Sequence, residues 1–240
     1  MAKVIVVGAN GRMGQLVCAT VEAEDGLELV GGYDVDTIDQ LDDDAPAVDV
    51  LIDFSRPEAL SHVAAYVQRT GTALLSGTTG LAEDDLALLK SLGSVAPVVW
   101  SSNYSLGVAV LRRVAAEAAR ALEGWDIEIA ETHHNQKADA PSGTAMALLA
   151  AVDPAGECAV SYGREGIVGV RPKREIGMHA LRGGTVAGTH EVHLFGTDEE
   201  VCLTHRAASR QIFVSGAVAC AKRLLTAGLG YHSFDELMFS

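Results

Sequence analysis

Basic residues are scarce in this chain of 240 residues. Its 18 lysines and arginines stand against 32 aspartates and glutamates, which gives a formal net charge of −14 at pH 7. Proteins that bind nucleic acid carry a basic patch, so we expect no nucleic-acid partner. An acidic balance mainly favours solubility. Any anionic substrate must therefore be attracted by a local cluster of basic residues.

Cysteine and long apolar runs are also scarce. The chain has four cysteines, none in C-x-x-C spacing, which argues against a zinc or redox motif. No signal peptide precedes the first strand-like run, and no apolar stretch of 18 residues follows it. We therefore expect a cytoplasmic protein with reduced thiols, no metal and no membrane association. The length suits one large domain or two modest ones.

The first part of the chain alternates short apolar runs with helical patterns. Strands are predicted at 3–7, 27–33, 48–54, 72–76 and 97–100, with helices at 55–69 and 83–92. This alternation is typical of an α/β fold, here a Rossmann-like doubly wound parallel sheet with right-handed crossovers. Ligands of such sheets lie beyond the carboxyl ends of the strands. The polar loops at 77–80 and 101–107 occupy such positions.

A glycine turn follows the first predicted strand. Gly8, Gly11 and Gly14 precede a helical apolar pattern, one residue off the familiar G-x-G-x-x-G spacing. Glycines let the backbone turn sharply and approach a pyrophosphate, which rests on the helix N-terminus. The pattern predicts a dinucleotide site. The alternative is a tight turn that binds no ligand.

Asp34 ends the second predicted strand, where an acidic residue binds the ribose 2′-hydroxyl of NAD. It also opens an acidic tract of Asp34, Asp36, Asp39 and residues 42–44, most of which we expect to be solvated loop. Arg12 is the only basic residue between Lys3 and Arg56. A 2′-phosphate would have few partners, so we expect NADH to be preferred, with NADPH as the alternative cofactor.

The second part of the chain no longer shows the regular alternation of strands and helices. We expect a helix at 108–122, a strand at 125–131, a helix at 144–151 and antiparallel strands from about residue 176. Hairpin turns are predicted at 182–184 and 196–198, and a closing helix at 210–227. The prediction is a dinucleotide-binding domain of residues 1–107 and 209–240, to which the closing helix returns, and a second α+β domain of residues 108–208 that binds substrate and forms the oligomer.

The segment from Glu131 to Ala145 is the densest in chemistry. His133, His134 and Lys137 lie within five positions, and histidine suits proton transfer near neutral pH. A helix start is expected at 139–142, with Pro141 in its first turn, and free N–H groups at such a start bind anions. The segment predicts a site that holds a small carboxylate and protonates it. Packed or surface roles are the alternatives for His133, and His134 could simply line the site.

Residues 128–145 resemble the signature of the 4-hydroxy-tetrahydrodipicolinate reductase (dihydrodipicolinate reductase) family. The pattern E-[IV]-x-E-x-H-x-x-x-K-x-D-x-P-S-G-T-A is matched at every fixed position, and the resemblance extends to residues 7–14, 52–57, 77–80, 102–107 and 204–210. It implies NAD(P)H-dependent reduction of 4-hydroxy-tetrahydrodipicolinate, a small dicarboxylate, to tetrahydrodipicolinate in lysine and diaminopimelate biosynthesis. It also implies a homotetramer assembled through the sheets of the substrate-binding domains.

The resemblance assigns roles residue by residue. His133 matches the family's proton donor and acceptor, and Lys137 its second catalytic residue. His134, Gly143 and Thr144 match substrate contacts, and Arg210 and Phe213 match positions near the cofactor and the hinge. The implied nicotinamide-nucleotide contacts are Gly8, Ala9, Asn10, Gly11, Arg12, Met13, Asp34, Gly77, Thr78, Thr79, Ser101, Ser102, Asn103 and Tyr104.

This chain departs from the family at several positions. Asn135 and Gln136 stand where many members carry basic residues, which weakens the positive field over the substrate. Val35 stands where members that use NADPH place an arginine, which supports NADH. A basic loop at 171–174 either closes over the substrate or is solvated.

Two other functions stay open: an NAD-dependent dehydrogenase of another small acidic substrate, and a non-catalytic NAD(H)-sensing protein, which would be expected to lack His133 or Lys137. The other β-domain histidines, His179, His190, His193 and His205, are expected to be structural or interfacial.

Overall fold

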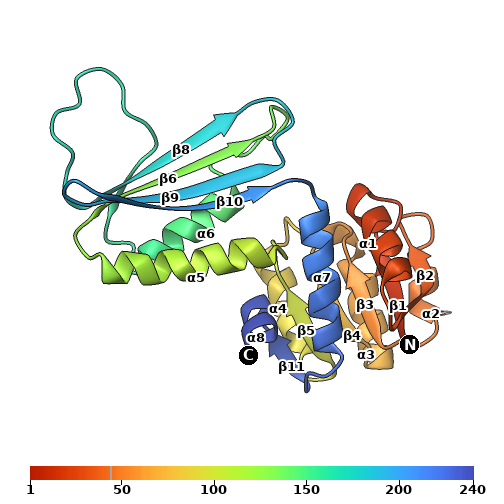
Figure 1. Ribbon diagram of the computed structural model, residues 1–240. Coiled ribbons are helices and arrows are strands. Elements are labelled where there is room, and N and C mark those ends of the chain that lie inside the picture. The colour runs from red at the N-terminus through yellow and green to blue at the C-terminus, as the bar shows by residue number, and fades with distance from the viewer. Residues whose placement is uncertain (44) are drawn as a thin grey trace. The chain divides into compact units, whose positions relative to one another are not determined.

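A computed structural model describes residues 1–43 and 45–240 (Figure 1). The chain divides into two compact units, Met1–Leu106 together with Gln211–Ser240, and Gly107–Arg210. In the described part of the chain, no helix has both the length and the apolar character needed to cross a membrane.

The first unit is built on a six-stranded sheet in which every pair of neighbouring strands is parallel. The strand order β11-β5-β4-β3-β1-β2 confirms the predicted Rossmann-like architecture. The strands are β1 (Ala2–Val7), β2 (Leu27–Tyr33), β3 (Val50–Asp53), β4 (Ala73–Ser76), β5 (Pro97–Trp100) and β11 (Gly230–His232). The helices are α1 (Arg12–Ala23), α2 (Gln40–Asp43), α3 (Leu60–Thr70) after a 3₁₀ turn at Pro57–Ala59, α4 (Glu83–Leu92), α7 (Gln211–Leu224) and α8 (Phe234–Phe239).

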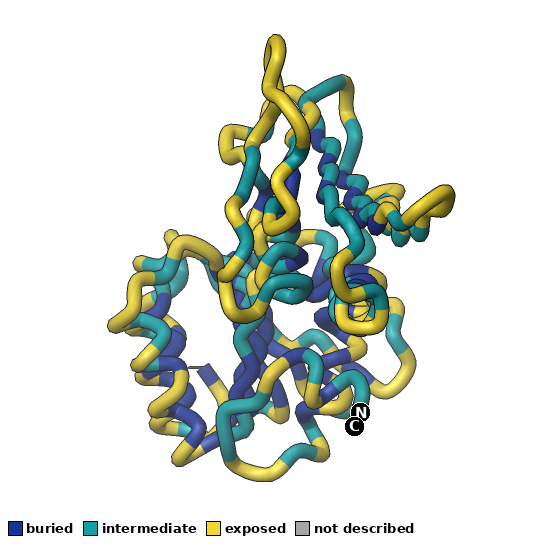
Figure 2. Tube along the Cα trace, turned by 90° about the vertical axis from the view of Figure 1, so that its left-hand side faces the viewer, coloured by how far each residue is buried: buried dark blue, intermediate teal, exposed yellow. Residues whose placement is uncertain are grey.

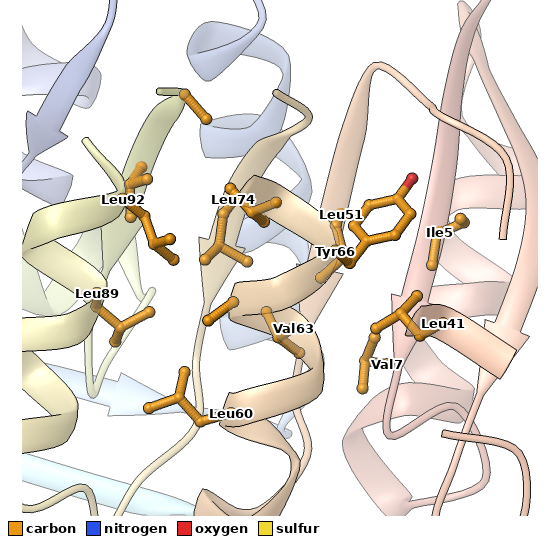
Figure 3. Packing of buried hydrophobic residues seen from close by; sticks show 14 of the residues in the cluster. Ile5, Val7, Leu41, Leu51, Leu60, Val63, Tyr66, Leu74, Leu89 and Leu92 are labelled. Atoms are coloured by element: carbon orange, nitrogen blue, oxygen red, sulfur yellow. The ribbon is translucent and has the colours of Figure 1, made fainter. Parts of the chain in front are cut away.

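The inner strands of this sheet are near-continuous apolar runs, as expected of a parallel sheet with helices on both faces. Residues 4–7 of β1 and 50–52 of β3 are fully buried. Figure 2 shows the buried residues of the chain in dark blue. On one face the side chains of α3 and α4 pack against those of the strands, with Tyr66, Leu74 and Leu89 in one cluster (Figure 3). Each fully buried Leu or Ile contributes roughly 1.5–3 kcal/mol of transfer free energy. The polar residues that matter for a site follow the carboxyl ends of these strands.

The end of the chain differs from the sequence prediction. The predicted closing helix is α7, but β11 and α8 follow it. β11 pairs in parallel with β5 and supplies a sixth strand, which the sequence analysis did not identify.

Part of the acidic tract is helical, where the sequence predicted a loop. Residues 40–43 form the short helix α2, in which Leu41 is fully buried. The carboxylate of Asp42 lies 2.9 Å from Nδ1 of His62 on α3. Asp36 and Asp39 are exposed, as expected of a loop. Asp44 lies outside the described residues.

The second unit contains a five-stranded sheet in the order β10-β9-β6-β8-β7. Its strands are β6 (Asp126–His133), β7 (Ala159–Ser161), β8 (Glu175–Arg182), β9 (Gly188–Phe195) and β10 (Glu200–Ala207), and its helices are α5 (Leu106–Ala121) and α6 (Gly143–Val152). The predicted antiparallel arrangement is wrong in part, because β8 is parallel to both β6 and β7. The turn at 182–184 is not a hairpin, since β9 pairs on the opposite edge of β6. The hairpin at 196–198 is confirmed between β9 and β10.

Both helices of this unit pack on one face of its sheet (Figure 1). Side chains alternate along a strand, so Ile129 and the two polar residues after it at spacing two, Glu131 and His133, all point to that helix-covered face. Ile129 joins the apolar core, with Leu148 of α6 and Val192 of β9. Glu131 and His133 continue the same row at the end of β6. The fold thereby places two ionisable side chains in a nearly buried position.

Candidate active site

In the glycine turn of the first unit, two of the three positions, Gly8 and Gly14, leave no room for a side chain beside the neighbouring backbone. Gly8 has φ of 80°, and a Cβ there would lie 2.6 Å from the carbonyl oxygen of Phe54. A Cβ on Gly14 would lie 1.9 Å from the carbonyl oxygen of Gly8. Gly11 is the N-cap of α1, and no side chain caps this helix. The N-terminus of α1, with Arg12 and Met13 in its first turn, is therefore available to an anion.

Asp34 lies beside this turn. Its Oδ2 accepts a hydrogen bond from the backbone N–H of Asn10 at 2.8 Å, and its Oδ1 accepts one from the N–H of Val35. The N–H groups of Gly8 and Ala9 donate to the carbonyl oxygen of Tyr33, the residue before Asp34. The structure thus brings the end of β2 and the glycine turn together, as a dinucleotide site needs.

The loop after β4 is held by a buried carboxylate. Asp53 is 1% exposed and accepts hydrogen bonds from the hydroxyls of Ser76 at 2.8 Å and Thr78 at 2.9 Å. Burial raises the pKa of Asp53, and the hydrogen bonds from Ser55, Ser76 and Thr78 oppose that rise. The Thr78 hydroxyl is directed inward, whereas Thr79 is exposed. Gly77 has no room for a side chain, since a Cβ would lie 2.5 Å from the ring of Phe54.

The loop after β5 is also held by hydrogen bonds. Ser101 donates through its hydroxyl to the carbonyl oxygen of Asn103, and Ser102 lies between them. Tyr104 is 1% exposed, and its hydroxyl donates to the carbonyl oxygen of Ser76 at 2.7 Å. The side chain of Tyr104 is therefore part of the core, so a role for this residue in binding a cofactor falls to its backbone.

In the second unit, Glu131 and His133 form a buried pair at the end of β6. Oε2 of Glu131 lies 2.5 Å from Nδ1 of His133. Arg182 on β8 binds both carboxylate oxygens of Glu131, each at 2.8 Å. Burial would raise the pKa of Glu131, but the hydrogen bonds from Arg182, His133 and the backbone of Ser142 outweigh it and hold that pKa below its ordinary value. The carboxylate is ionised at neutral pH.

His190 lies next to this pair. Its ring centroid is 5.0 Å from that of His133, and its Nε2 is 3.1 Å from the hydroxyl of Ser142. Burial, with the nearby His133 as second cause, lowers the pKa of His190 to about 4. His190 is therefore neutral at pH 7. His190 is 4% exposed and borders His133, so the structural role expected for it from the sequence stays a prediction, now placed beside the candidate site.

Lys137 lies in the segment between β6 and α6. Its Nζ pairs with Oδ1 of Asp139 at 2.8 Å, and this bond is the main cause that lowers the pKa of Asp139. The first residue of this segment is held by the backbone, because the N–H of His134 donates to the carbonyl oxygen of Val186 at 2.8 Å. Lys137 keeps 21% of its side chain exposed, so an anionic ligand can reach its ammonium group.

The start of α6 lies close to the Glu131–His133 pair, because the N–H of Ser142 donates to Oε1 of Glu131 at 3.0 Å. Ser142 is the N-cap and accepts a hydrogen bond from the N–H of Ala145. Pro141 therefore precedes the cap, and its predicted place in the first turn is wrong. Gly143 is exposed and a Cβ added there would meet nothing within 4 Å. Gly143 and Thr144 are the first two helical residues, where backbone N–H groups attract an anion.

The basic loop at 171–174 is tied to the sheet. Arg171 pairs with Asp126 at 2.7 Å and with Glu128 at 3.2 Å, and Arg174 pairs with Glu157. Both guanidinium groups are thus paired with carboxylates, and the side chain of Arg174 is largely exposed; closure of this loop over a substrate stays a prediction.

Three residues around His133 were not predicted to belong to the candidate site: Glu131, Arg182 and His190. Glu131 stands in the signature and shares the period of two with His133, which was a usable signal. Arg182 and His190 reach the cluster only through the pairing of β6 with β8 and β9.

One group of side chains among the described residues has the composition and spacing to hold a metal ion. It consists of His193, Glu200 and Cys202 on β9 and β10, with Nδ1 of His193 already 2.5 Å from Glu200. The group is largely exposed, and exposed groups of this kind are common without a metal. The expectation that no metal is bound stays a prediction.

Comparison with known proteins identifies the family. The family models for the N-terminus and the C-terminus of dihydrodipicolinate reductase match residues 2–104 and 107–238. A 4-hydroxy-tetrahydrodipicolinate reductase of Alkalilimnicola ehrlichii is 42% identical over 98% of each chain, and one of Haloarcula marismortui is 38% identical over 97% of this chain and 98% of its own. The fold matches that of a dipicolinate-bound dihydrodipicolinate reductase from Paenisporosarcina sp. TG-14 over all of both chains, with a TM-score of 0.79 and 22% identity. The family predicted from the sequence is thus confirmed: the chain belongs to the dihydrodipicolinate reductases.

Proposed function

We propose that this protein reduces 4-hydroxy-tetrahydrodipicolinate to tetrahydrodipicolinate with NAD(P)H, releasing NAD(P)⁺ and water and consuming one proton. The observation that carries the proposal is the buried Glu131–His133 pair beside the exposed start of α6. A proton donor and an anion-binding helix end are the two groups that reduction of a cyclic dicarboxylate needs. The identities of 36–42% with reductases of this name support the same activity.

The residues of the second unit hold the substrate and deliver the proton. The N–H groups of Gly143 and Thr144 and the ammonium of Lys137 neutralise the substrate carboxylates, and His134 contributes a further contact. His133 donates the proton through Nε2, because Nδ1 faces the carboxylate of Glu131. Lys137 is the second proton donor. A general acid placed in this way contributes roughly 10²- to 10⁴-fold to the rate.

The residues of the first unit bind the cofactor, which supplies the hydride when bound. The uncapped N-terminus of α1, with Gly11, Arg12 and Met13, fits a pyrophosphate. Asp34 fits the adenosine ribose, since a carboxylate oxygen that already accepts from Asn10 can accept a second hydrogen bond from a hydroxyl. The exposed Thr79 and the backbones of Gly77, Thr78 and residues 101–104 border the other half of the cofactor. NADH is preferred over NADPH, because Val35 offers no charge to a 2′-phosphate.

The proposed assembly and location rest on what is expected of the family. We propose a cytoplasmic homotetramer that forms through the sheets of residues 108–208 and needs no metal. Sedimentation velocity tests the tetramer, and an assay after dialysis against EDTA tests the absence of a metal requirement. A monomer, or activity that is lost with EDTA and regained with a divalent metal, would contradict them.

The first test is an assay at 340 nm with freshly generated 4-hydroxy-tetrahydrodipicolinate and either NADH or NADPH. We expect oxidation of NADH by the wild-type protein, and a kcat lower by about 10²- to 10⁴-fold in His133→Gln with NADH binding unchanged. His232→Gln, which alters a histidine of the first unit, is the matched control and keeps wild-type kcat. Near-normal turnover by His133→Gln would contradict the assigned role.

Two other functions make different predictions in the same assay. A dehydrogenase of another small acidic substrate would leave this substrate unreduced but turn over another acid in a substrate panel. A sensor would bind NADH and turn over none of them. The presence of both His133 and Lys137 argues against the sensor.

A further inference from the structure

Glu131 connects two parts of the proposed active site. It lies two residues before His133 in β6 and is 1% exposed. Its Oε2 contacts Nδ1 of His133 at 2.5 Å, and its Oε1 accepts a hydrogen bond from the N–H of Ser142 at 3.0 Å. Ser142 is the N-cap of α6. One carboxylate therefore fixes both the proton donor and the helix start that faces the substrate.

The state of this carboxylate determines the state of His133. Arg182 donates to Oε1 and Oε2, so that together with Ser142 and His133 four hydrogen bonds reach the two oxygens of Glu131. An ionised carboxylate only accepts hydrogen bonds, so the hydrogen between Glu131 and His133 must be on Nδ1. Nε2 is then the ring nitrogen that takes up and delivers a proton.

Nε2 of His133 is uncrowded because the neighbouring residue on β9 is a glycine. Gly188 on β9 has φ of 157°, and a Cβ there would lie 3.1 Å from Nε2 of His133. Any larger residue at this position would crowd the nitrogen. The two ring nitrogens of His133 thus have opposite environments, one held by a carboxylate and the other kept uncrowded.

We propose that Glu131 is a positioning residue for proton transfer: it fixes the Nδ1–H form of His133 and aligns it with the start of α6. This inference rests on the proposed function. It assigns two roles to Glu131. The carboxylate decides that Nε2 of His133 donates the proton, and it balances the positive charge of the His133 imidazolium before the proton leaves.

The other charged groups around His133 are already balanced. Arg182 from β8 is paired with Glu131, and Lys137 from the following segment is paired with Asp139. His190 from β9 is neutral, and His205 of β10 lies opposite His190 in the sheet, on its far side from β6. Removal of the charge of Glu131 would therefore leave a protonated His133 beside the cation of Arg182.

The kinetic test compares Glu131→Gln, Glu131→Asp and wild type across pH. We expect Glu131→Gln to lower kcat about ten- to a hundredfold with an unchanged KM for NADH, and to move the alkaline limb of the kcat profile to lower pH by ~1 unit. Glu131→Asp retains a carboxylate and should restore the position of that limb. Glu128→Gln is the matched control, because Glu128 is on the same strand, pairs with arginines and faces away from His133; its pH profile should not move.

A spectroscopic test is read on the wild-type protein, and a variant is used only to assign the signal of His133. We expect ¹⁵N chemical shifts of the wild-type imidazoles to show His133, assigned by its absence in His133→Gln, protonated on Nδ1 and unprotonated on Nε2 above the pH at which it loses its charge. The Nε2–H form in the wild type would overturn the proposal. So would a wild-type kcat and pH profile in Glu131→Gln.

These readouts separate this inference from the proposed function. If the wild-type protein does not reduce 4-hydroxy-tetrahydrodipicolinate, the proposed function fails while the tautomer measurement still decides the state of His133. If the wild type is active and His133→Gln is not, but Glu131→Gln behaves as the wild type, the function stands and the role of Glu131 is overturned.

Discussion

The carboxylate of Asp34 accepts a hydrogen bond of 2.8 Å from the backbone N–H of Asn10 in the glycine turn. This bond places the acidic side chain next to the proposed pyrophosphate site, at the distance along the chain where a ribose is bound. Val35 follows it and is 81% exposed. The residue after Asp34 is thus free to vary without disturbing the core.

We predict that Val35→Arg raises kcat/KM with NADPH about tenfold while that with NADH changes by less than about threefold. A guanidinium group at this exposed position can pair with a 2′-phosphate, and a contact worth ~1.4 kcal/mol corresponds to a factor of ten. The measurement is the ratio of the two kcat/KM values at 340 nm. Val35→Gln, of similar length but without charge, is the control and should leave the ratio unchanged; an equal gain there would exclude a charge effect.

A second prediction concerns Gly143 at the start of α6. Its φ is not positive and its Cβ position is open, so Gly143→Ala fits the fold. The added methyl group would occupy the open space at the helix N-terminus where we propose that the substrate carboxylate binds. We expect KM for the substrate to rise about tenfold with the melting temperature unchanged or slightly higher, since alanine favours a helix. Gly228→Ala, also exposed and open, is the control and should leave KM unchanged.

A third prediction concerns the pair of Lys137 and Asp139. If Lys137 binds a substrate carboxylate as proposed, that carboxylate replaces Asp139 at the ammonium group, and the two substitutions should then have different effects. We expect Lys137→Met to lower kcat/KM about 10²- to 10³-fold, because the variant loses both a charge contact with the substrate and a proton donor. Asp139→Asn, the control for the pair, should change kcat/KM by less than about threefold. Equal losses in both variants would mean that the pair is structural.

The parallel sheet and its glycine turn could be predicted because their signals are local. Apolar runs of four to seven residues followed by glycine or polar turns identify β1 and its helix without any knowledge of distant residues. β7 and β11 were missed because each has only three residues and no apolar period of its own. The pairing of β8 was predicted wrongly because a strand's alternation is the same in parallel and antiparallel pairs.

The candidate site was predicted only in part, because only some of its residues are close to one another in the chain. His133 and Lys137 are close in the chain, so their grouping is visible in the sequence. Glu131 meets Arg182 across 51 residues of chain, and that contact exists only because β8 pairs with β6. Ser142 meets His190 across 48 residues through the packing of α6 on β9. Such contacts depend on register, which no local pattern of residues determines.

The last prediction concerns the stability of the second unit at acidic pH. Glu128 on β6 pairs with Arg164, Arg171 and His179. Burial would raise its pKa, but these hydrogen bonds outweigh burial and lower the pKa to about 2 from an ordinary value of 4.5. The folded state therefore binds a proton at Glu128 less readily than the unfolded state does. The stabilisation is complete above pH 4.5 and is lost as the pH falls from 4.5 toward 2.

Glu128→Gln should accordingly reduce the free energy of unfolding at pH 7 by on the order of 2 kcal/mol, since each pKa unit is worth about 1.4 kcal/mol and solvent at the partly exposed Arg164 screens part of it. The difference between variant and wild type should shrink between pH 4.5 and pH 2. Urea unfolding at several pH values measures both quantities. Glu117→Gln breaks an exposed ion pair with Arg120 and serves as the control, with a change within about 0.5 kcal/mol at any pH. A pH-independent difference for Glu128→Gln would mean that the side chain stabilises the sheet by packing rather than by charge.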